Sequence, residues 1–407
     1  MQYKIRLLEK TINHHLKRGK SILLLGPRQT GKSTLVQKYK FDLSLSFLLP
    51  AIRLRYEKNP DLLAGEIDAL RGKKKKQILV CLDEVQKVPA IMDVVQYLID
   101  NKTAQFVLTG SSARKLKRGS NLNLLPGRLV SLRLDPFVYN EYSVLTIEQM
   151  LLYGNLPGIV QEKKRTDREI DLASYVEAYL EEEIRSEALV RNIGSFARFL
   201  EYAGLESGKI VNYRALSQEI GVSHTTIMAY FEILKDCLIA EFIEPLCKSK
   251  TRKKLTKTNR FLLFDLGVRR LCAKEADRLQ PQRMGELFEQ YVGLELIRYA
   301  RLTDAGTKIR FWRDPDGPEV DWVIEKNNSY IPIEVKWNTT PRNKDIKHLK
   351  VFLEEYPQAS IGYLICRTPR KVKLEKNIFA IPWKELHNLF DWPESGHHTK
   401  SKEKRKT

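Results

Sequence analysis

The stretch ILLLGPRQTGKSTLVQK, from Ile22 to Lys38, determines how the first part of this chain folds. Its leading apolar residues predict a buried parallel strand. The residues from Gly26 to Ser33 then match the pattern G-x-x-x-x-G-K-[ST] at every fixed position, and an apolar run compatible with a helix follows. The stretch therefore predicts a strand, a glycine-rich loop and a helix, in the order that a phosphate-binding loop requires.

The chemistry expected of this loop is anion binding. Glycine at both ends allows the backbone N–H groups to turn inward around a phosphate, and the following helix adds its unpaired N–H groups and positive dipole end. We expect Lys32 to contact the β- and γ-phosphates of ATP and the Ser33 hydroxyl to bind Mg²⁺. The alternative is a chance glycine turn between a strand and a helix. The predicted nucleotide-binding residues are Gly26, Pro27, Arg28, Gln29, Thr30, Gly31, Lys32, Ser33 and Thr34.

Length and composition indicate a globular protein of two or three domains. Of the 407 residues, 43% are hydrophobic, and no apolar run approaches the length of a membrane span. The chain begins with an amphipathic pattern that lacks the apolar core of a signal peptide. The five cysteines are scattered and include no C-x-x-C pair, which indicates neither a disulfide framework nor a zinc site. We therefore expect a cytoplasmic protein without a membrane partner.

The charge balance is strongly basic. Lys and Arg number 70 against 50 Asp and Glu, which gives a net charge of +20 and a pI near 9.6. Such a balance favours a polyanionic partner, and DNA is the partner we expect. The alternative is that the basic residues only confer solubility.

A second motif, QILVCLDE from Gln77 to Glu84, is an apolar run that ends in two carboxylates. It follows the glycine loop by about fifty residues, as a Walker B strand does. We expect Asp83 to hold Mg²⁺ through water and Glu84 to orient or deprotonate the attacking water. The alternative is a strand end with two solvated acids.

A third apolar run, from Gln105 to Ser112, also ends in small polar residues. Thr109 and Ser111 are suited to sense the γ-phosphate or to hold the attacking water, although ordinary strand caps have the same composition. Arg128, after a tight turn, is a candidate for an arginine that stabilises transition-state charge, in cis or across the subunit boundary of a homo-oligomer. The alternative for Arg128 is a structural ion pair.

The spacing of these motifs predicts an α/β fold with an open, mostly parallel sheet over residues 1–135, with each functional residue at the carboxyl end of a strand. Residues 136–207 show helical periodicity and predict a helical lid or connector.

Residues 208–275 have the pattern of a winged helix-turn-helix. A helix is predicted from Asn212 to Ile220, and a second helix, capped by Ser223, ends near Leu234. Two predicted strands flank a segment, residues 248–260, with seven basic and no acidic residues, where DNA phosphates would bind. The second helix is poor in Arg, Asn and Gln, which argues against strong sequence specificity. The alternative is a winged helix used only for packing. The candidate nucleic-acid-binding residues are Lys250, Arg252, Lys253, Lys254 and Lys257.

Residues 283–392 predict a helix that carries Glu289, a hairpin that carries Asp321, and a strand with Glu334 and Lys336 on one face. Asp321 and Glu334 could hold Mg²⁺, and Lys336 could orient a water or stabilise negative charge, which is the arrangement needed to hydrolyse a phosphodiester. The alternative is a set of paired charges in a non-catalytic fold. Residues 393–407 predict a disordered basic tail.

Taken together, these motifs resemble a widespread prokaryotic family of AAA-type ATPases of the AAA+ superfamily. In that family a winged helix and a C-terminal domain of unknown function, related to PD-(D/E)XK nucleases, follow the ATPase core. The resemblance implies a restriction-endonuclease-like α/β domain with Glu289, Asp321, Glu334 and Lys336 at its centre. The motifs that carry the resemblance are GPRQTGKST at 26–34, LDEVQ at 82–86, LTGSS at 108–112, LPGR at 125–128, GELFE at 285–289, EVDWV at 319–323 and PIEVK at 332–336.

Three functions are compatible with these features. The leading hypothesis is an ATPase whose nucleotide state controls a DNA-directed winged-helix and nuclease-like module. The second is an Mg²⁺-dependent DNA nuclease that is active only with ATP. The third is a non-catalytic, nucleotide-switched DNA-binding regulator.

Overall fold

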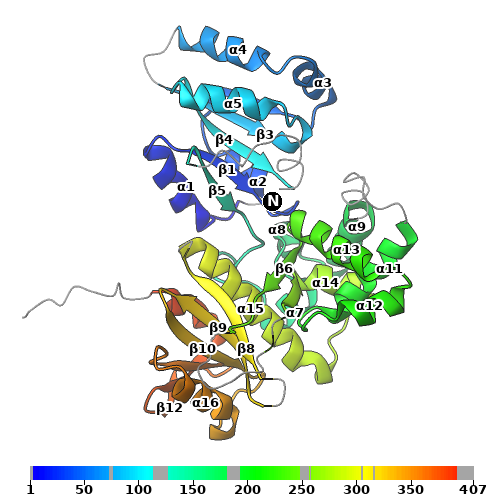
Figure 1. Ribbon diagram of the computed structural model, residues 1–407, viewed down its shortest axis with the longest axis vertical. Coiled ribbons are helices and arrows are strands. Elements are labelled where there is room, and N and C mark those ends of the chain that lie inside the picture. Colours follow the sequence, from blue (N-terminus) through cyan, green and yellow to red (C-terminus); the bar gives the residue numbers. More distant parts are fainter. Residues whose placement is uncertain are drawn as a thin grey trace, which may run out of the picture.

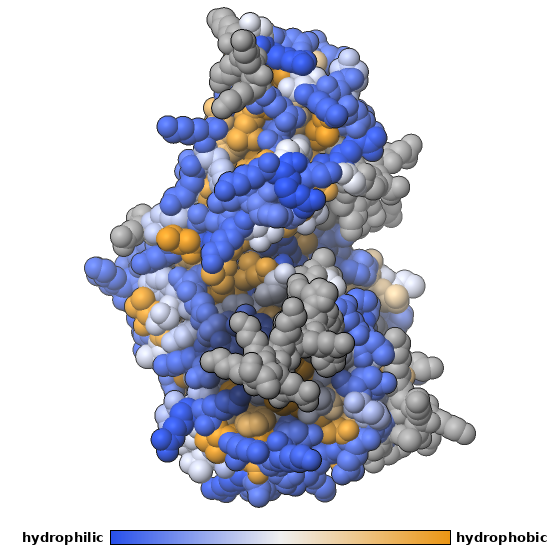
Figure 2. Space-filling view, turned by 90° about the vertical axis from the view of Figure 1, so that its left-hand side faces the viewer, coloured by the Kyte–Doolittle hydropathy of each residue, from blue (hydrophilic) through white to orange (hydrophobic). Residues whose placement is uncertain are grey.

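A computed structural model describes residues 3–72, 77–112, 127–180, 193–247, 256, 258–303, 306–314 and 317–391. The described residues up to 135 form a domain that we call the core domain. It lies at one end of an elongated molecule, and the described residues that follow it lie at the other end (Figure 1). The predicted basic tail, residues 393–407, lies outside the described residues. No helix in the described ranges is long and apolar enough to cross a membrane. On the face that Figure 2 shows, hydrophilic residues dominate, and the apolar ones form separate smaller areas.

The core domain is built on a five-stranded sheet in which every neighbouring pair of strands is parallel. This confirms the predicted parallel α/β sheet. Strand β1, which precedes the glycine loop, lies between β4 and β5, so that the loop emerges from the interior of the sheet. In spatial order the strands are β2 (Leu43–Ser46), β3 (Ile78–Asp83), β4 (Ala104–Gly110), β1 (Ser21–Leu25) and β5 (Leu129–Arg133).

Strand β1 is buried on both faces, which explains its continuous apolar sequence. Leu23 and Leu25 contribute to the core cluster that includes buried residues of α3, α4 and α5, whereas Ile22 and Leu24 join the cluster that includes buried residues of α1 and α2. The helices of this domain are α1 (Leu8–Lys17), α2 (Lys32–Val36), α3 (Pro50–Lys58), α4 (Leu62–Arg71) and α5 (Ile91–Asp100), with a 3-10 turn η1 (Val85–Lys87).

The middle region is mostly helical. Its helix-turn-helix segment lies where the sequence predicts it: Gly221, at φ 77°, ends the first helix, and the Ser223 hydroxyl accepts a bond from Thr226 N, 3.1 Å away, at the start of the second. A winged-helix function for this segment stays a prediction. The elements are α7 (Ile147–Tyr153), α8 (Pro157–Gln161), α9 (Arg165–Ser174), a π-helix (Tyr175–Leu180), α11 (Ile193–Glu206), α12 (Tyr213–Ile220), α13 (His224–Asp236), the antiparallel pair β6 (Ala240–Ile243) and β7 (Arg260–Leu263), and α14 (Leu266–Cys272).

The C-terminal region is a mixed six-stranded sheet with a long helix, α15 (Met284–Thr303), packed on one face and α16 (Lys347–Glu355) on the other. The hairpin and the third strand that the sequence predicts are present, while a nuclease-like identity stays a prediction. In spatial order the strands are β12 (Val372–Glu375), β13 (Ile378–Pro382), β11 (Gly362–Cys366), β10 (Ser329–Val335), β9 (Glu319–Lys326) and β8 (Lys308–Arg313), with 3-10 turns at Pro281–Arg283, Asn343–Ile346 and Trp383–Phe390.

Helix α15 depends on a close approach to the C-terminal sheet. A Cβ atom on Gly293 would lie 2.2 Å from Cζ2 of Trp322, whose indole is fully buried and cannot move aside. Gly285, in the first turn of the same helix, has nothing within 4 Å of the corresponding position.

We therefore expect Gly293→Ala to destabilise the protein by about 3 kcal/mol through overpacking, whereas Gly285→Ala should be neutral or slightly stabilising. Denaturant unfolding of both variants checks this expectation. Equal effects of the two substitutions would contradict the packing described for α15.

Candidate functional site

The loop between β1 and α2 has the backbone geometry that an anion-binding loop needs. Gly31 adopts φ 91°, a left-handed conformation that favours glycine. A Cβ atom on Gly26 would lie 2.3 Å from the backbone oxygen of Leu134, so only glycine fits there. The Gly26 N–H donates to Gly110 O at the end of β4, at 3.2 Å, which fixes the loop to the neighbouring strand. Both glycines of the sequence pattern are thus required by the structure.

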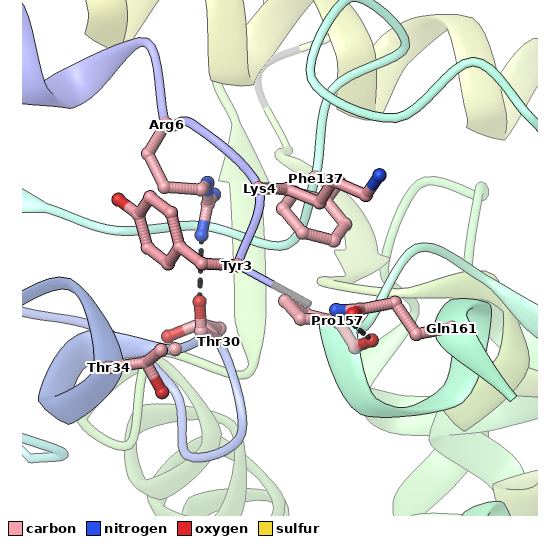
Figure 3. Close-up of a pocket in the computed structure, with 9 residues that line it drawn as sticks. Tyr3, Lys4, Arg6, Thr30, Thr34, Phe137, Pro157 and Gln161 are labelled. Carbon is pink, nitrogen blue, oxygen red and sulfur yellow. Dashed lines mark hydrogen bonds between the residues drawn. The ribbon is translucent and has the colours of Figure 1, made fainter. Parts of the chain in front are cut away.

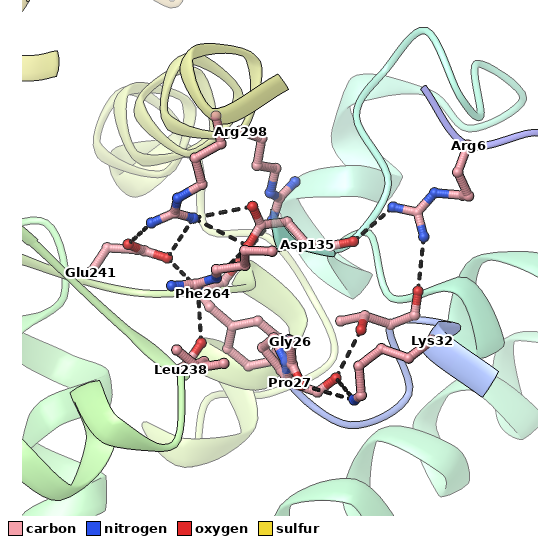
Figure 4. A network of polar contacts seen from close by, with 12 residues as sticks. Arg6, Gly26, Pro27, Lys32, Asp135, Leu238, Glu241, Phe264 and Arg298 are labelled. Carbon is pink, nitrogen blue, oxygen red and sulfur yellow. Dashed lines mark hydrogen bonds and ion pairs between the residues drawn. The ribbon is translucent and has the colours of Figure 1, made fainter. Parts of the chain in front are cut away.

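Lys32 lies inside this loop rather than on the surface. Its side chain is buried, and Nζ donates to Gly26 O at 2.8 Å and to Pro27 O at 3.0 Å (Figure 4). The Thr30 hydroxyl also donates to Pro27 O, at 2.8 Å. The ammonium group is therefore positioned within the curve of the loop, where a bound phosphate would meet it. Of the other predicted loop residues, Arg28 is half-buried, and Gln29, Ser33 and Thr34 are exposed.

Asp83 joins the glycine loop to the neighbouring strands. Its Oδ1 accepts from the Ser33 hydroxyl at 3.5 Å and from the Thr109 hydroxyl, and its Oδ2 accepts from the Ser46 hydroxyl at 3.2 Å. The structure thus brings together Ser33, Asp83 and Thr109 at the carboxyl edge of the sheet. A hydroxyl and a carboxylate beside a phosphate-binding loop are oxygen ligands of the kind that Mg²⁺ takes together with substrate phosphates, so these residues fit the ion.

Glu84 is buried in a small polar pocket next to Asp83. Its backbone is left-handed, at φ 60°, and its N–H donates to the Thr109 hydroxyl at 3.1 Å. Its Oε2 accepts from the Ser111 hydroxyl at 3.1 Å and from the Gln86 side-chain amide. Gln86 is a residue of this site that the sequence analysis did not assign, although it lies within the motif LDEVQ.

Arg128 occupies a different edge of the sheet. The register pairs Ser21 with Leu129 and Leu25 with Arg133, so Arg128 lies at the amino end of β5, roughly 15 Å from the glycine loop along the strand direction. Its guanidinium pairs with Asp100 at the end of α5. The prediction that Arg128 acts in cis is therefore not supported by its position, and the ion pair that was its alternative is present. A role across a subunit boundary stays a prediction.

Arg6, which the sequence analysis did not single out, also holds the glycine loop in place. The guanidinium is buried; it donates from Nη1 to Thr30 O at 2.8 Å and from Nη2 to Asp135 O at 2.7 Å. It also forms an ion pair with Glu141, with 3.1 Å between Nε and Oε2, and stacks on the Phe137 ring at 4.8 Å. One side chain thereby connects the loop to the segment that leaves β5.

A cavity of about 150 Å³ opens beside the loop (Figure 3). Thr30, Gly31 and Thr34 form one side of it, and the aromatic rings of Tyr3 and Phe137 contribute apolar surface. Two residues of α8 complete the lining. The Gln161 amide nitrogen donates to Pro157 O at 3.1 Å. The full lining consists of Tyr3, Lys4, Arg6, Thr30, Gly31, Thr34, Phe137, Pro157 and Gln161.

A buried ion-pair network continues from Asp135 into the other two regions (Figure 4). The Asp135 carboxylate pairs with Arg133 at 2.8 Å and with Arg301 of α15 at 3.1 Å, and both arginines also pair with Glu241 of β6. Burial would raise the pKa of Asp135, but Arg301 and Arg133 lower it to about 2. The carboxylate therefore stays charged, and the network links the core, β6 and α15.

Glu295 forms a second buried link between α15 and the segment after β5. Its Oε2 accepts from Tyr139 N at 3.0 Å, and its Oε1 pairs with Arg298 at 3.4 Å. Arg298 also donates to Phe137 O at 3.1 Å and to Phe264 O at 2.8 Å. Burial raises the pKa of Glu295 to about 7, despite the nearby guanidinium of Arg298.

The four residues predicted for a nuclease-like centre do come together. Lys336 Nζ lies 2.7 Å from Glu334 Oε1, and Asp321 Oδ2 accepts from Val335 N at 2.8 Å. Burial and the Asp321 carboxylate raise the pKa of Glu289 and of Glu334 to about 8 each. The sequence analysis missed a fifth member of this centre, Arg260 of β7, which pairs with Glu289 at 2.7 Å.

Two further parts of the predicted site stay predictions. Within the described ranges, no group of three or more His, Cys, Asp or Glu side chains is arranged to hold a metal ion. The proposed metal ligands Asp321 and Glu334 are therefore not placed with a third such ligand. The candidate nucleic-acid-binding residues lie outside the described residues; they are Lys250, Arg252, Lys253, Lys254 and Lys257.

Family comparisons agree with the site at the glycine loop. Residues 18–143 match the family model described as an AAA domain, so the chain carries an AAA-type P-loop domain, the class to which nucleotide-binding ATPases belong. Residues 145–280 and 284–386 match two domains of unknown function, DUF8612 and DUF4143. These matches assign no activity to the middle and C-terminal regions.

The similar curated proteins are themselves uncharacterized. Two, from Mycobacterium bovis and Mycobacterium tuberculosis, are 24% identical over 331 residues, which is 80% of this chain and 72% of each relative. Another, from Methanocaldococcus jannaschii, is 23% identical over an alignment of 431 residues, covering 93% of this chain and 87% of the relative. A crystal structure of a Vibrio cholerae protein covers 91% of this chain and 96% of its own at 14% identity, but its TM-score of 0.21 supports no conclusion.

The raised pKa of Glu295 predicts a pH dependence of stability. The Glu295 carboxyl has a pKa of about 7 in the folded state and near 4.5 in the unfolded state. It therefore stabilises the folded state most when the pH is below the unfolded-state pKa. Its contribution is lost as the pH rises through 7, and the loss amounts to about 3 kcal/mol at 1.4 kcal/mol per pKa unit. Glu295→Gln is neutral at every pH. We therefore expect its free energy of unfolding, measured with urea between pH 5 and pH 8, to fall less with rising pH than that of the wild type. The exposed Glu354→Gln is the control and should keep the wild-type slope. Identical slopes in wild type and Glu295→Gln would contradict the buried position of this group.

Proposed function

We propose that this protein binds ATP together with Mg²⁺ at the loop from Gly26 to Thr34 and hydrolyses it. The observation that carries the proposal is the convergence of three strand ends. Lys32 follows β1, Asp83 and Glu84 end β3, and Thr109 lies near the end of β4; all are at the carboxyl edge of a parallel sheet, where ligands of open α/β sheets bind. The match of residues 18–143 to an AAA domain supports the same conclusion.

Each residue has a definite task in this reaction. The loop N–H groups and the Lys32 ammonium hold the β- and γ-phosphates and stabilise the charge that builds up as the terminal phosphoryl group leaves. Ser33 and Asp83 would hold Mg²⁺, which neutralises phosphate charge when bound. Glu84 accepts the proton of the attacking water, and the Ser111 hydroxyl and the Gln86 amide keep its carboxylate in place.

The cavity beside the loop is suited to the nucleoside part of ATP. It begins at Gly31 and Thr34, and the rings of Tyr3 and Phe137 contribute apolar surface that a base could contact. Pro157 and Gln161 of α8 line the same cavity and belong to the middle region. A nucleotide bound in this way would contact both the core domain and α8.

A DNA-directed role for residues 208–275 stays a second proposal. It is supported by the net charge of +20 and by the order of α12, α13, β6 and β7. Mg²⁺-dependent phosphodiester cleavage has less support than ATP hydrolysis: Asp321, Glu334 and Lys336 lie together, but in the described ranges no three carboxyl, imidazole or thiol side chains are grouped to hold a metal ion.

The ATPase proposal predicts the effects of two substitutions. Lys32→Ala should lower the turnover of ATP by about a hundredfold or more, because a charge that stabilises the transition state is removed. Glu84→Gln should lower turnover by a similar factor while ATP still binds, because only the proton acceptor is lost. Steady-state phosphate release and equilibrium nucleotide binding measure the two effects separately.

Two exposed residues of the same domain provide matched controls. Lys40→Ala and Glu57→Gln repeat the chemical changes away from the loop and should leave turnover at the wild-type rate. Wild-type turnover in Lys32→Ala would remove the basis of the proposal. Wild-type turnover in Glu84→Gln would leave ATP binding intact but would exclude the assigned proton acceptor.

A further inference from the structure

Strand β7 of the middle region places a cation among the acidic residues Glu289, Asp321 and Glu334 of the C-terminal domain. Arg260 begins this strand and is buried. Its Nη1 donates to Glu289 Oε1 of α15 at 2.7 Å and to the backbone oxygen of Asp321 in β9 at 3.1 Å. The guanidinium also lies over the Phe311 and Trp322 rings, at 4.9 and 5.0 Å from their centroids. A single side chain therefore joins β7 to one helix and two strands of another domain.

One oxygen of each carboxylate in this centre is engaged by another group, whereas Glu334 Oε2 is buried without a hydrogen-bond partner. Arg260 holds a carboxylate oxygen of Glu289, Lys336 holds Oε1 of Glu334, and the N–H of Val335 holds Oδ2 of Asp321. Three acids face two cationic side chains in this centre, so most of the negative charge is already balanced within the protein. Two cations therefore already contact the acids that would hold Mg²⁺ in a nuclease-like domain, and no three-ligand group is present in the described part of the chain.

A second ion-pair site holds the same strand pair at the other end of α15. Glu241 of β6 pairs with Arg301, near the last turn of α15, while Arg260 of β7 pairs with Glu289, near its first turns. The register pairs Glu241 with Leu262 and Ile243 with Arg260, so both contacts belong to one two-stranded ribbon. The two sites lie 12 residues apart on the helix, which corresponds to about 18 Å at 1.5 Å per residue. Two fixed points along one helix determine the orientation of the ribbon.

We propose that the centre formed by Arg260, Glu289, Asp321, Glu334 and Lys336 is an ion-pair lock between the β6–β7 ribbon and the C-terminal domain, in which the two cationic side chains take the place of a divalent metal ion. The lock fixes the middle region to α15 and β9. Removing one partner of such a buried pair leaves the other charge unpaired, which weakens the contact far more than replacing an exposed pair would.

Hydrogen exchange on the full chain tests whether the ion-pair lock holds the β6–β7 ribbon against the C-terminal domain. Arg260→Met keeps an unbranched side chain between the two aromatic rings but removes the charge. We expect amides of residues 260–263 and 319–324 to exchange at least about tenfold faster in this variant, with the core strands unchanged. Arg313→Met is the matched control, because Arg313 lies on the adjacent β8 and its pair with Glu319 is half-exposed, and it should exchange like wild type. Wild-type exchange in Arg260→Met would overturn the lock.

Glu289→Gln removes the other partner of the pair and should speed up hydrogen exchange of the same amides. It provides the test if Arg260→Met does not fold. The exchange rates of Arg260→Met/Glu289→Gln should rise less than the product of the two single effects, because both substitutions break one interaction. If the effects of the two substitutions on the exchange rates simply multiply, Arg260 and Glu289 do not interact directly.

Titration with Mn²⁺ alone, followed by electron paramagnetic resonance, tests whether the centre around Glu334 binds a metal ion. The titration uses the full chain with Asp83→Asn, which weakens Mn²⁺ binding at the nucleotide loop. We expect the same amount of bound Mn²⁺ whether or not Glu334→Gln is added. A Mn²⁺ site that disappears in Glu334→Gln would show that the centre holds a metal ion and would overturn the proposal.

Discussion

The buried guanidinium of Arg6 is the contact on which the arrangement of this protein depends. It binds Thr30 O in the glycine loop, Asp135 O after β5 and the Glu141 side chain further along the same segment. A buried charge is costly unless it is paired and hydrogen-bonded, so these three segments must keep their positions together. The glycine loop is consequently held both by β4 and by Arg6, and Arg6 also holds the segment that leads into the middle region.

From Asp135 the polar contacts continue without interruption to the C-terminal domain. Arg133 and Arg301 bridge Asp135 and Glu241, and Glu295 with Arg298 ties α15 to the segment after β5. Helix α15 is also fastened near its start, by Arg260 and Glu289. This helix therefore receives contacts from the core, from the β6–β7 ribbon and from its own sheet. Arg6 and α15 are connected through Asp135, whose backbone oxygen accepts from Arg6 and whose carboxylate pairs with Arg301.

The sequence was most informative where function depends on neighbouring residues or on strand ends. The loop pattern and the carboxylates at Asp83 and Glu84 were assigned correctly to one edge of a parallel sheet, because in such a sheet the carboxyl ends of strands meet. Strand β2, with the sequence LSLS, was missed because it is short and only half apolar. Arg6 and Arg260 could not be found, since their partners lie far away in the chain and an isolated arginine carries no pattern. The position of Arg128 at the amino end of β5 could not be predicted, because sequence order does not show at which end of a strand a turn lies.

The position proposed for the nucleotide, between the core domain and α8 of the middle region, is the central point to test. Hydrogen exchange of the Glu84→Gln protein, with and without ATP and Mg²⁺, tests it most directly. The account predicts slower exchange in three separate segments: residues 26–34 of the loop, residues 3–6 at the start of the chain, and residues 157–161 of α8. Protection limited to the loop and the end of β3, with residues 157–161 unchanged at saturating ATP, would contradict it.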